Sequence, residues 1–180
     1  EELDTARGGG VVFSQAVHQI DVVRLLGGGL ARSVRAHTGA WDPARPTEGA
    51  YAMLMDFEDG AFASLTYSGY GHFDTAVLQG GIGELGHPVP EDSYGRARQA
   101  LAGLAAEDEA ALKRARTFAA AEAPASPVAH EHFGFLLACC DRADLRPRPD
   151  GVMVYGDAEA RHEALGPPAI PRQPVIDALH

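Results

Sequence analysis

The chain has 180 residues, of which 46% are hydrophobic and 22% are charged, a balance typical of one globular domain with a substantial core. Its formal net charge of -10 argues against nucleic acid or an anionic membrane as a general partner. No apolar run in the sequence is long enough to cross a membrane.

The ends of the chain and its cysteines bear on where the protein acts. The chain opens on Glu-Glu-Leu-Asp, without the basic and apolar segments of a signal peptide. Its two cysteines, Cys139 and Cys140, are adjacent, and a disulfide between them would need strained geometry. Free thiols in a reducing cytoplasm are therefore expected. Both ends look like cuts within a longer polypeptide, so we expect a fragment.

The first stretch with a clear pattern runs between two glycine triplets, residues 8–10 and 27–29. Apolar residues recur between them at helical spacing and predict one buried helix face: Phe13, Ala16, Val17, Ile20 and Val23. Ser14, His18 and Asp21 fall on a neighbouring stripe, four and three residues apart. The first triplet allows close approach of a ligand or backbone, and the second suits the end of a helix.

Three strands are expected next. Residues 31–38 predict a short strand, and residues 50–58 and 61–68 are apolar, β-prone runs joined at Glu-Asp-Gly60, which predicts a hairpin. Neither face of this hairpin is plainly polar: Tyr51 and Met53 lie on one face and Leu54 on the other. A sheet with one wet face should alternate cleanly. We therefore expect helices on one face and a second layer, another subunit or another domain, on the other.

The second half of the chain predicts a long glycine-rich loop over residues 69–92 and an amphipathic helical insertion over residues 93–123. Strands are expected over residues 133–140 and 152–155, paired around the turn between them. Since strands follow one another instead of alternating with helices, the expected class is α+β. Its sheet should be open and mainly antiparallel, with helices packed on one face.

His18 is the leading candidate for chemistry. Histidine suits the removal of a proton from an alcohol near neutral pH while a hydride leaves the carbon. Ser14 and Asp21 could orient the imidazole, and Gly10 would leave room for a substrate. The alternative is a histidine that only forms hydrogen bonds at a helix surface.

Other candidates have weaker support. Several lie at loop edges: Trp41, Arg45, Tyr67, Tyr70 and His72. They suit an aromatic or carboxylated ligand through stacking and charge, but packing and solvation explain each of them equally well. His130 and His132 with the two cysteines match no closed zinc pattern, so no metal site is predicted.

One long motif resembles a known family. The run Gly-Gly-Gly-Val-Val-Phe-Ser-Gln-Ala-Val-His-Gln-Ile-Asp-Val-Val-Arg-Leu-Leu-Gly-Gly, residues 8–28, is similar to the signature opening the C-terminal domain of the glucose–fructose oxidoreductase/inositol dehydrogenase (Gfo/Idh/MocA) family. The hairpin at Glu-Asp-Gly60 and the run Val-Met-Val-Tyr-Gly156 also resemble that domain. Residues 41–86 and 140–146 look most similar to its dihydroxyphthalate dihydrodiol dehydrogenase branch.

The resemblance implies that residues 1–180 are a substrate-binding and oligomerisation domain. The N-terminal Rossmann domain, absent here, would bind NAD or NADP. His18 would be the catalytic base, and the parent would oxidise a polyol, sugar or cis-dihydrodiol as a homo-oligomer formed through the sheet. Ser14 stands where many members have aspartate, and a serine can form hydrogen bonds but supplies no charge.

This fragment by itself should bind no cofactor. The two glycine triplets are no Gly-x-Gly-x-x-Gly motif opening a βαβ unit, and Gly80-Gly-Ile-Gly83 follows no convincing strand and opens no clear helix. The family's catalytic lysine belongs to the Rossmann domain, and Lys113, in the predicted insertion, is a poor substitute. The fragment alone is therefore expected to be inactive. A non-catalytic binding or assembly module of the same fold is the alternative, and Ser14 is the residue that allows it.

Overall fold

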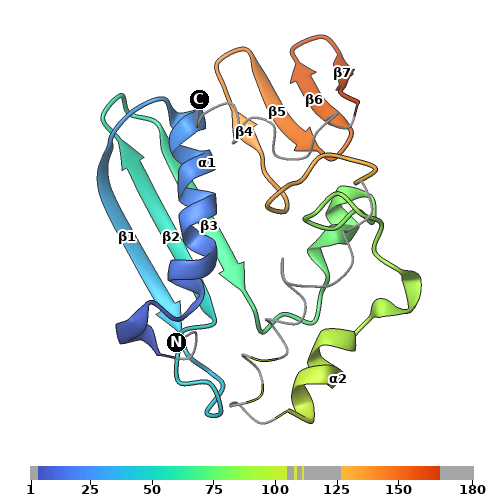
Figure 1. Ribbon diagram of the computed structural model, residues 1–180. Helices are drawn as coiled ribbons and strands as arrows, with labels where there is room; N and C mark the ends of the chain where they lie inside the picture. The colour runs from blue at the N-terminus through green and yellow to red at the C-terminus, as the bar shows by residue number, and fades with distance from the viewer. Residues whose placement is uncertain (1–3, 105–107, 109–110, 112–126, 167–180) are drawn as a thin grey trace, which may run out of the picture. The chain divides into compact units, whose positions relative to one another are not determined.

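The computed structural model describes residues 4–104, 108, 111 and 127–166. The chain divides into two compact units, one formed by Glu1–His72 and Ala97–Ala120, the other by Phe73–Arg96 and Ala121–His180. Each unit contains an antiparallel sheet, as Figure 1 shows. The predicted α+β class with open antiparallel sheets is therefore confirmed.

The first unit is a three-stranded sheet with a helix over one face (Figure 1). Its strands β1 (Ala31–Gly39), β2 (Ala50–Phe57) and β3 (Phe62–Ser68) pair in the order β1-β2-β3. The predicted hairpin is present between β2 and β3. Its turn contains Gly60 at φ 95°, a left-handed conformation that glycine adopts without strain.

The core of this unit lies between β2 and the helical segment formed by a π-helical turn (Val12–Ala16) and α1 (Val17–Gly27). Alternate side chains of a strand share one face. On β2 the buried row is Tyr51, Met53, Met55 and Phe57. A Cβ added at Gly27 would lie 2.9 Å from the Phe57 ring, so the close approach of the helix end to the sheet requires glycine.

The first turn of the helix departs from its sequence pattern. Phe13 and Val17, expected in the core, are 68% and 46% exposed. Residues 12–16 form a π-helical turn, which holds more residues than an α-helical turn. Val12 therefore packs on the core with Ala16 and Ile20. The expectation for Phe13 and Val17 is wrong because it assumed an unbroken α-helical period.

The opposite face of this sheet carries a mixed set of side chains around a shallow hollow of about 340 Å³. Arg35 and His37 come from β1, Leu54 from β2, and Ser64 and Thr66 from β3. Leu54 is 39% exposed, and no described element of this unit covers the face. This surface, called the open face below, is more polar than the hairpin sequence alone suggests.

The second unit is a four-stranded sheet in the order β4-β5-β6-β7. Its strands are β4 (Ala138–Cys139), β5 (Ala143–Arg148), β6 (Gly151–Gly156) and β7 (Ala160–Ala164). The strand predicted over residues 133–140 is wrong for residues 133–137, which lie outside the sheet. β7 was not predicted, because its five residues are all exposed and show no apolar alternation.

β5 lies where the sequence predicted only a turn, and it contains Pro147. Proline has no N–H to donate to a ladder and is confined to strand positions where that donor is not needed. β4 pairs only with Asp144 and Leu145, so Pro147 lies beyond that pairing. The short neighbouring strand is therefore what makes the proline compatible with β5.

Short helices complete the description: η1 (Thr5–Arg7), η3 (Thr75–Gln79), η4 (Glu91–Ser93) and α2 (Arg96–Ala102). α2 falls within the predicted helical insertion over residues 93–123. Most of that range lies outside the described residues, so the insertion stays a prediction.

Neighbouring side chains on β2 test the one-sided core. Met55 is 2% exposed on the α1 side, whereas Leu54 is 39% exposed on the open face. We expect Met55→Ala to lower the free energy of unfolding by about 2–5 kcal/mol, because it leaves a cavity. Leu54→Ala, the matched control, should cost about 1 kcal/mol or less. Urea denaturation measures both values, and equal losses would contradict this core.

Candidate functional site

The glycine loop and the first helical turn are held by Glu48, which lies two residues before β2. The backbone N–H of Val12 donates to Glu48 Oε1 at 3.1 Å, and that of Val11 donates to the Glu48 carbonyl at 3.1 Å. Thr5 donates its hydroxyl to Oε2 at 3.4 Å. A carboxylate at this position satisfies a free N–H group and interacts favourably with the positive end of the helix.

Gly10 is constrained by the same carboxylate. Its φ of 96° is in the left-handed region, and an added Cβ would overlap the Glu48 carboxylate. The structure therefore accounts for this glycine through Glu48, and its contact with a substrate stays a prediction. The Gly10 carbonyl also accepts two hydrogen bonds from Ser14, from Oγ at 3.0 Å and from the backbone N–H at 3.2 Å.

The polar row predicted on the helix is displayed at its surface. Ser14, His18 and Asp21 are all exposed, while the opposite side of the helix packs on the sheet. Ser14 lies in the π-helical turn, and His18 is the second residue of α1. The row is therefore accessible to a ligand, and the catalytic roles of its members stay predictions.

Tyr67 is linked to the helix through a second tyrosine. Its ring stacks on that of Tyr51, with centroids 5.8 Å apart and planes at 15°. The Tyr51 hydroxyl donates to Gln19 Oε1 at 2.7 Å, and Gln19 follows His18 directly in the sequence. Burial, with a smaller contribution from Tyr67, raises the pKa of Tyr51 to about 12. This hydroxyl therefore stays protonated near neutral pH.

Trp41 and Arg45 make contacts within their own loop. The Trp41 ring lies 5.1 Å from that of Tyr70, and the Trp41 N–H donates to the Tyr70 hydroxyl at 3.1 Å. Arg45 pairs with Asp42 at 2.7 Å, and this hydrogen bond lowers the pKa of the Asp42 carboxyl. Trp41 is 68% exposed, which leaves ring surface for a ligand.

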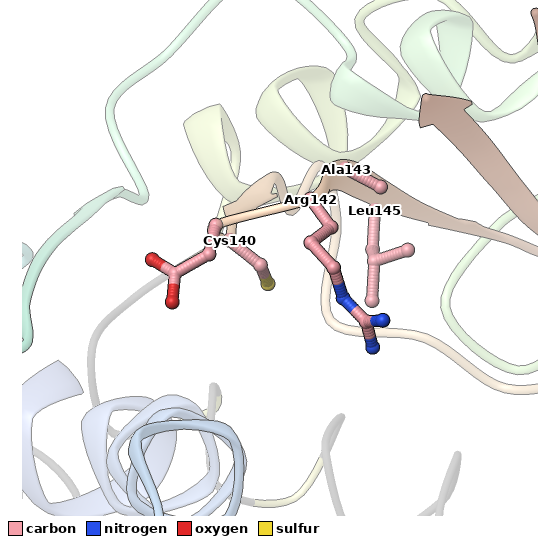
Figure 2. A pocket seen from close by; sticks show the side chains of 5 residues that line it. Cys140, Arg142, Ala143 and Leu145 are labelled. Atoms are coloured by element: carbon pink, nitrogen blue, oxygen red, sulfur yellow. The ribbon is translucent and has the colours of Figure 1, made fainter. Parts of the chain in front are cut away.

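The second unit has a hollow of about 330 Å³ at the β4–β5 turn (Figure 2). It is lined by Cys140, Asp141, Arg142, Ala143 and Leu145. On the neighbouring strand, a hydrogen bond with Asp144, then burial, raises the pKa of the Cys139 thiol. The thiolate is the nucleophile and the metal ligand, so this thiol is poorly suited to either role.

The histidines considered for metal binding contact backbone atoms instead. His130 Nε2 lies 2.7 Å from the Gly166 carbonyl, and His132 Nε2 lies 3.0 Å from the Ile82 carbonyl. The Gly134 N–H donates to His132 Nδ1, which leaves the proton of that ring on Nε2. Among the described residues, no group of three or more metal-ligating side chains is found.

Both described sheets are antiparallel throughout. Dinucleotide-binding folds instead use parallel strand–helix–strand units with a glycine-rich turn. The described part of the chain contains no unit of that kind. None of the described helices is long and apolar enough to cross a membrane.

Residues 1–82 match the family model of the GFO/IDH/MocA C-terminal domain. The chain carries a GFO/IDH/MocA C-terminal domain. The match includes the whole glycine-bounded helix and the hairpin, and so contains every candidate site residue of the first unit, Glu48 included.

Two relatives extend the comparison beyond the family model. The chain is 41% identical over 184 residues to 1-carboxy-3-chloro-3,4-dihydroxycyclohexa-1,5-diene dehydrogenase of Comamonas testosteroni, covering 99% of this chain and 46% of that protein. It also matches the crystal structure of a protein from Bordetella bronchiseptica RB50 with a TM-score of 0.87 and 40% identity. That protein is described as a dehydrogenase, and its description names no substrate. That match covers 99% of this chain and 47% of the other. The GFO/IDH/MocA chain thus spans about half the length of these relatives.

The structure joins some of the predicted site residues and leaves others apart. Gly10 and Ser14 are directly hydrogen-bonded, and Tyr67 is connected to α1 through Tyr51 and Gln19. Sequence reasoning missed Glu48. Its contact with Val12 spans 36 residues, and no local pattern marks it.

The raised pKa of Tyr51 predicts a specific loss of stability in alkali. Because the pKa of Tyr51 is about 12 in the folded chain against its ordinary value of 10.0, the folded state binds the proton more tightly than the unfolded state. The resulting contribution to the free energy of unfolding is complete below about pH 10 and is lost as the pH rises to about 12. We expect the stability of Tyr51→Phe to fall less over that interval than that of the parent chain. Denaturant unfolding from pH 9 to 12 measures this, and parallel curves would contradict it.

Proposed function

We propose that this chain is the substrate-binding domain of an NAD(P)-dependent dehydrogenase that oxidises a CH–OH group of a hydroxylated ring compound. The observation that carries the proposal is the 41% identity, along 99% of the chain, to a dehydrogenase named for a carboxylated dihydroxycyclohexadiene. This name favours a ring diol with a carboxylate over a sugar or an inositol. The exposed His18 within the family match supplies a group suited to the chemistry.

His18 would act as the general base. It would accept the proton of the substrate hydroxyl as the C–H bond to the same carbon breaks, so that an alcohol becomes a ketone. NAD(P), held by a Rossmann domain outside this chain, would accept the hydride. The Ser14 hydroxyl, which already donates to the Gly10 carbonyl, keeps lone pairs that can accept a hydrogen bond from the imidazole or the substrate. Asp21, one turn along the helix, would orient His18.

The substrate contacts are proposed for Gly10, Asp21, Trp41, Arg45 and Tyr67. Trp41 offers an exposed ring face for stacking on an unsaturated ring. Arg45 would bind a substrate carboxylate, for which its guanidinium geometry is suited, in competition with Asp42. Contacts within the chain are enough to explain each of these residues by itself. Each substrate contact is therefore a separate part of the proposal.

We also propose that the parent forms a homo-oligomer through the open face. The N-terminal Rossmann domain of the same polypeptide would be the second partner of this domain. The exposed Leu54 and the shallow hollow around it support such an interface. The exposed, unbridged cysteines support a reducing cytoplasm as its location. The net charge of -10 gives no support to nucleic acid as a partner.

A non-catalytic binding module is the second candidate. The feature that favours it is Ser14, because its hydroxyl proton is engaged by the Gly10 carbonyl and it cannot supply the negative charge of an aspartate. A module of this kind would bind the ring compound without proton transfer at His18.

Replacement of His18 separates the two candidates. In the full-length parent, His18→Ala should reduce kcat by about 100-fold or more, since general-base catalysis contributes about 10²–10⁴-fold. His162→Ala, at an exposed residue of β7, is the matched control and should retain kcat. Steady-state kinetics with a carboxylated ring diol measures both. Unchanged kcat in His18→Ala would favour the non-catalytic module.

The proposed interface has its own test. Leu54→Glu places a charge on the open face, and we expect the parent to sediment as a smaller species at micromolar concentration because burying an unpaired charge is unfavourable. Ala61→Glu, in the hairpin turn, should leave the sedimentation coefficient unchanged. A parent that already sediments as a monomer would contradict the proposed oligomer.

A further inference from the structure

We infer that Glu48 is a positioning residue of the proposed active site, acting on Ser14 and on the start of the helix that carries His18. This inference rests on the proposed function, because its consequence is catalytic only if Ser14 and His18 take part in the reaction. Neither the family match nor the named relatives assign a role to Glu48.

Glu48 performs the capping that the helix lacks locally. Helix N-termini normally receive a side-chain acceptor from the residue just before the first turn. Here that residue is Val11, which makes no side-chain cap hydrogen bond. The Glu48 carboxylate, from a loop 36 residues further along, accepts from the Val12 N–H instead. The helix start is therefore tied to the segment that leads directly into β2.

The carboxylate also determines where the Gly10 peptide lies. Its oxygens occupy the space beside the Gly10 Cα that any Cβ would need. The N–H of Val11, the next residue, donates to the Glu48 backbone carbonyl at 3.1 Å. Thr5 donates to the other carboxylate oxygen. Both sides of the glycine loop are thus attached to one residue.

The Gly10 carbonyl transmits this position to Ser14. It accepts from both Oγ and the backbone N–H of Ser14, so the direction of this carbonyl sets the direction of the hydroxyl. His18 follows one helical turn later on the same exposed row. A shift of the Gly10 peptide would therefore move the hydroxyl relative to the imidazole and the substrate.

A double-mutant cycle in the full-length parent tests the inference. We expect Glu48→Ala to lower kcat by about tenfold to a hundredfold, with a smaller change in KM, because a displaced catalytic group affects the reaction more than the binding of the substrate. In a Ser14→Ala background the same change should cost much less, since both substitutions act through one carbonyl. A residue that only stabilised the fold would lower the activity by the same factor in both backgrounds.

Controls keep the outcomes distinct. Glu58→Ala, at the exposed hairpin turn, should leave kcat unchanged, and all assays are run well below the melting temperature of each variant. If Glu48→Ala does not fold, Glu48→Gln, which keeps an acceptor oxygen but loses the charge, goes through the same cycle, and faster hydrogen exchange at the Val12 amide is then also expected. Unchanged kcat, or independent effects of Glu48 and Ser14, would overturn the inference.

The result for His18→Ala separates this inference from the function on which it rests. If His18→Ala abolishes turnover and the Glu48 variants do not impair it, only the positioning role is lost. If His18→Ala leaves turnover unchanged, the proposed function fails first.

Discussion

The packing of one row of β2 against the helical segment is the constraint on which the first unit depends. Met55 and Phe57 are almost completely buried in this contact, and Tyr51 and Met53 extend the row. Burying a side chain of this size contributes about 1.5–3 kcal/mol. Because one side of the helix is used for packing, the polar row with Ser14 and His18 can only lie on the other side. The same contact that stabilises the unit therefore displays its candidate chemistry.

Both ends of the helix are adjusted to this packing by glycine. At the end of α1, Gly27 lies against the Phe57 ring, where a Cβ would be too close. At the start, Gly10 leaves space for the Glu48 carboxylate. One glycine thus allows an apolar contact and the other allows a polar one. Together they fix the height of the helix over the sheet at two separate points.

Among its described residues, the second unit buries few apolar side chains and makes several polar contacts to backbone carbonyls. Arg146 donates to the Leu78 carbonyl at 2.5 Å and lies over the Phe135 ring at 5.3 Å. Gln79, only 4% exposed, donates to the Gly134 carbonyl at 2.5 Å. These contacts attach η3 and the irregular segment after residue 130 to the sheet.

The sequence by itself determined the elements whose pattern is local: the hairpin around Gly60, the helix between the glycine triplets, the α+β class and the exposed row of Ser14, His18 and Asp21. Side-chain periodicity and turn chemistry act over a few residues, so they can be read directly from the chain. The tertiary structure alone decided the π-helical turn that exposes Phe13, the strand β5 with its proline, and the role of Glu48. Each of these depends on a partner distant in sequence: the core that selects Val12 over Phe13, the short β4 whose pairing ends before Pro147, and a helix start 36 residues from its cap.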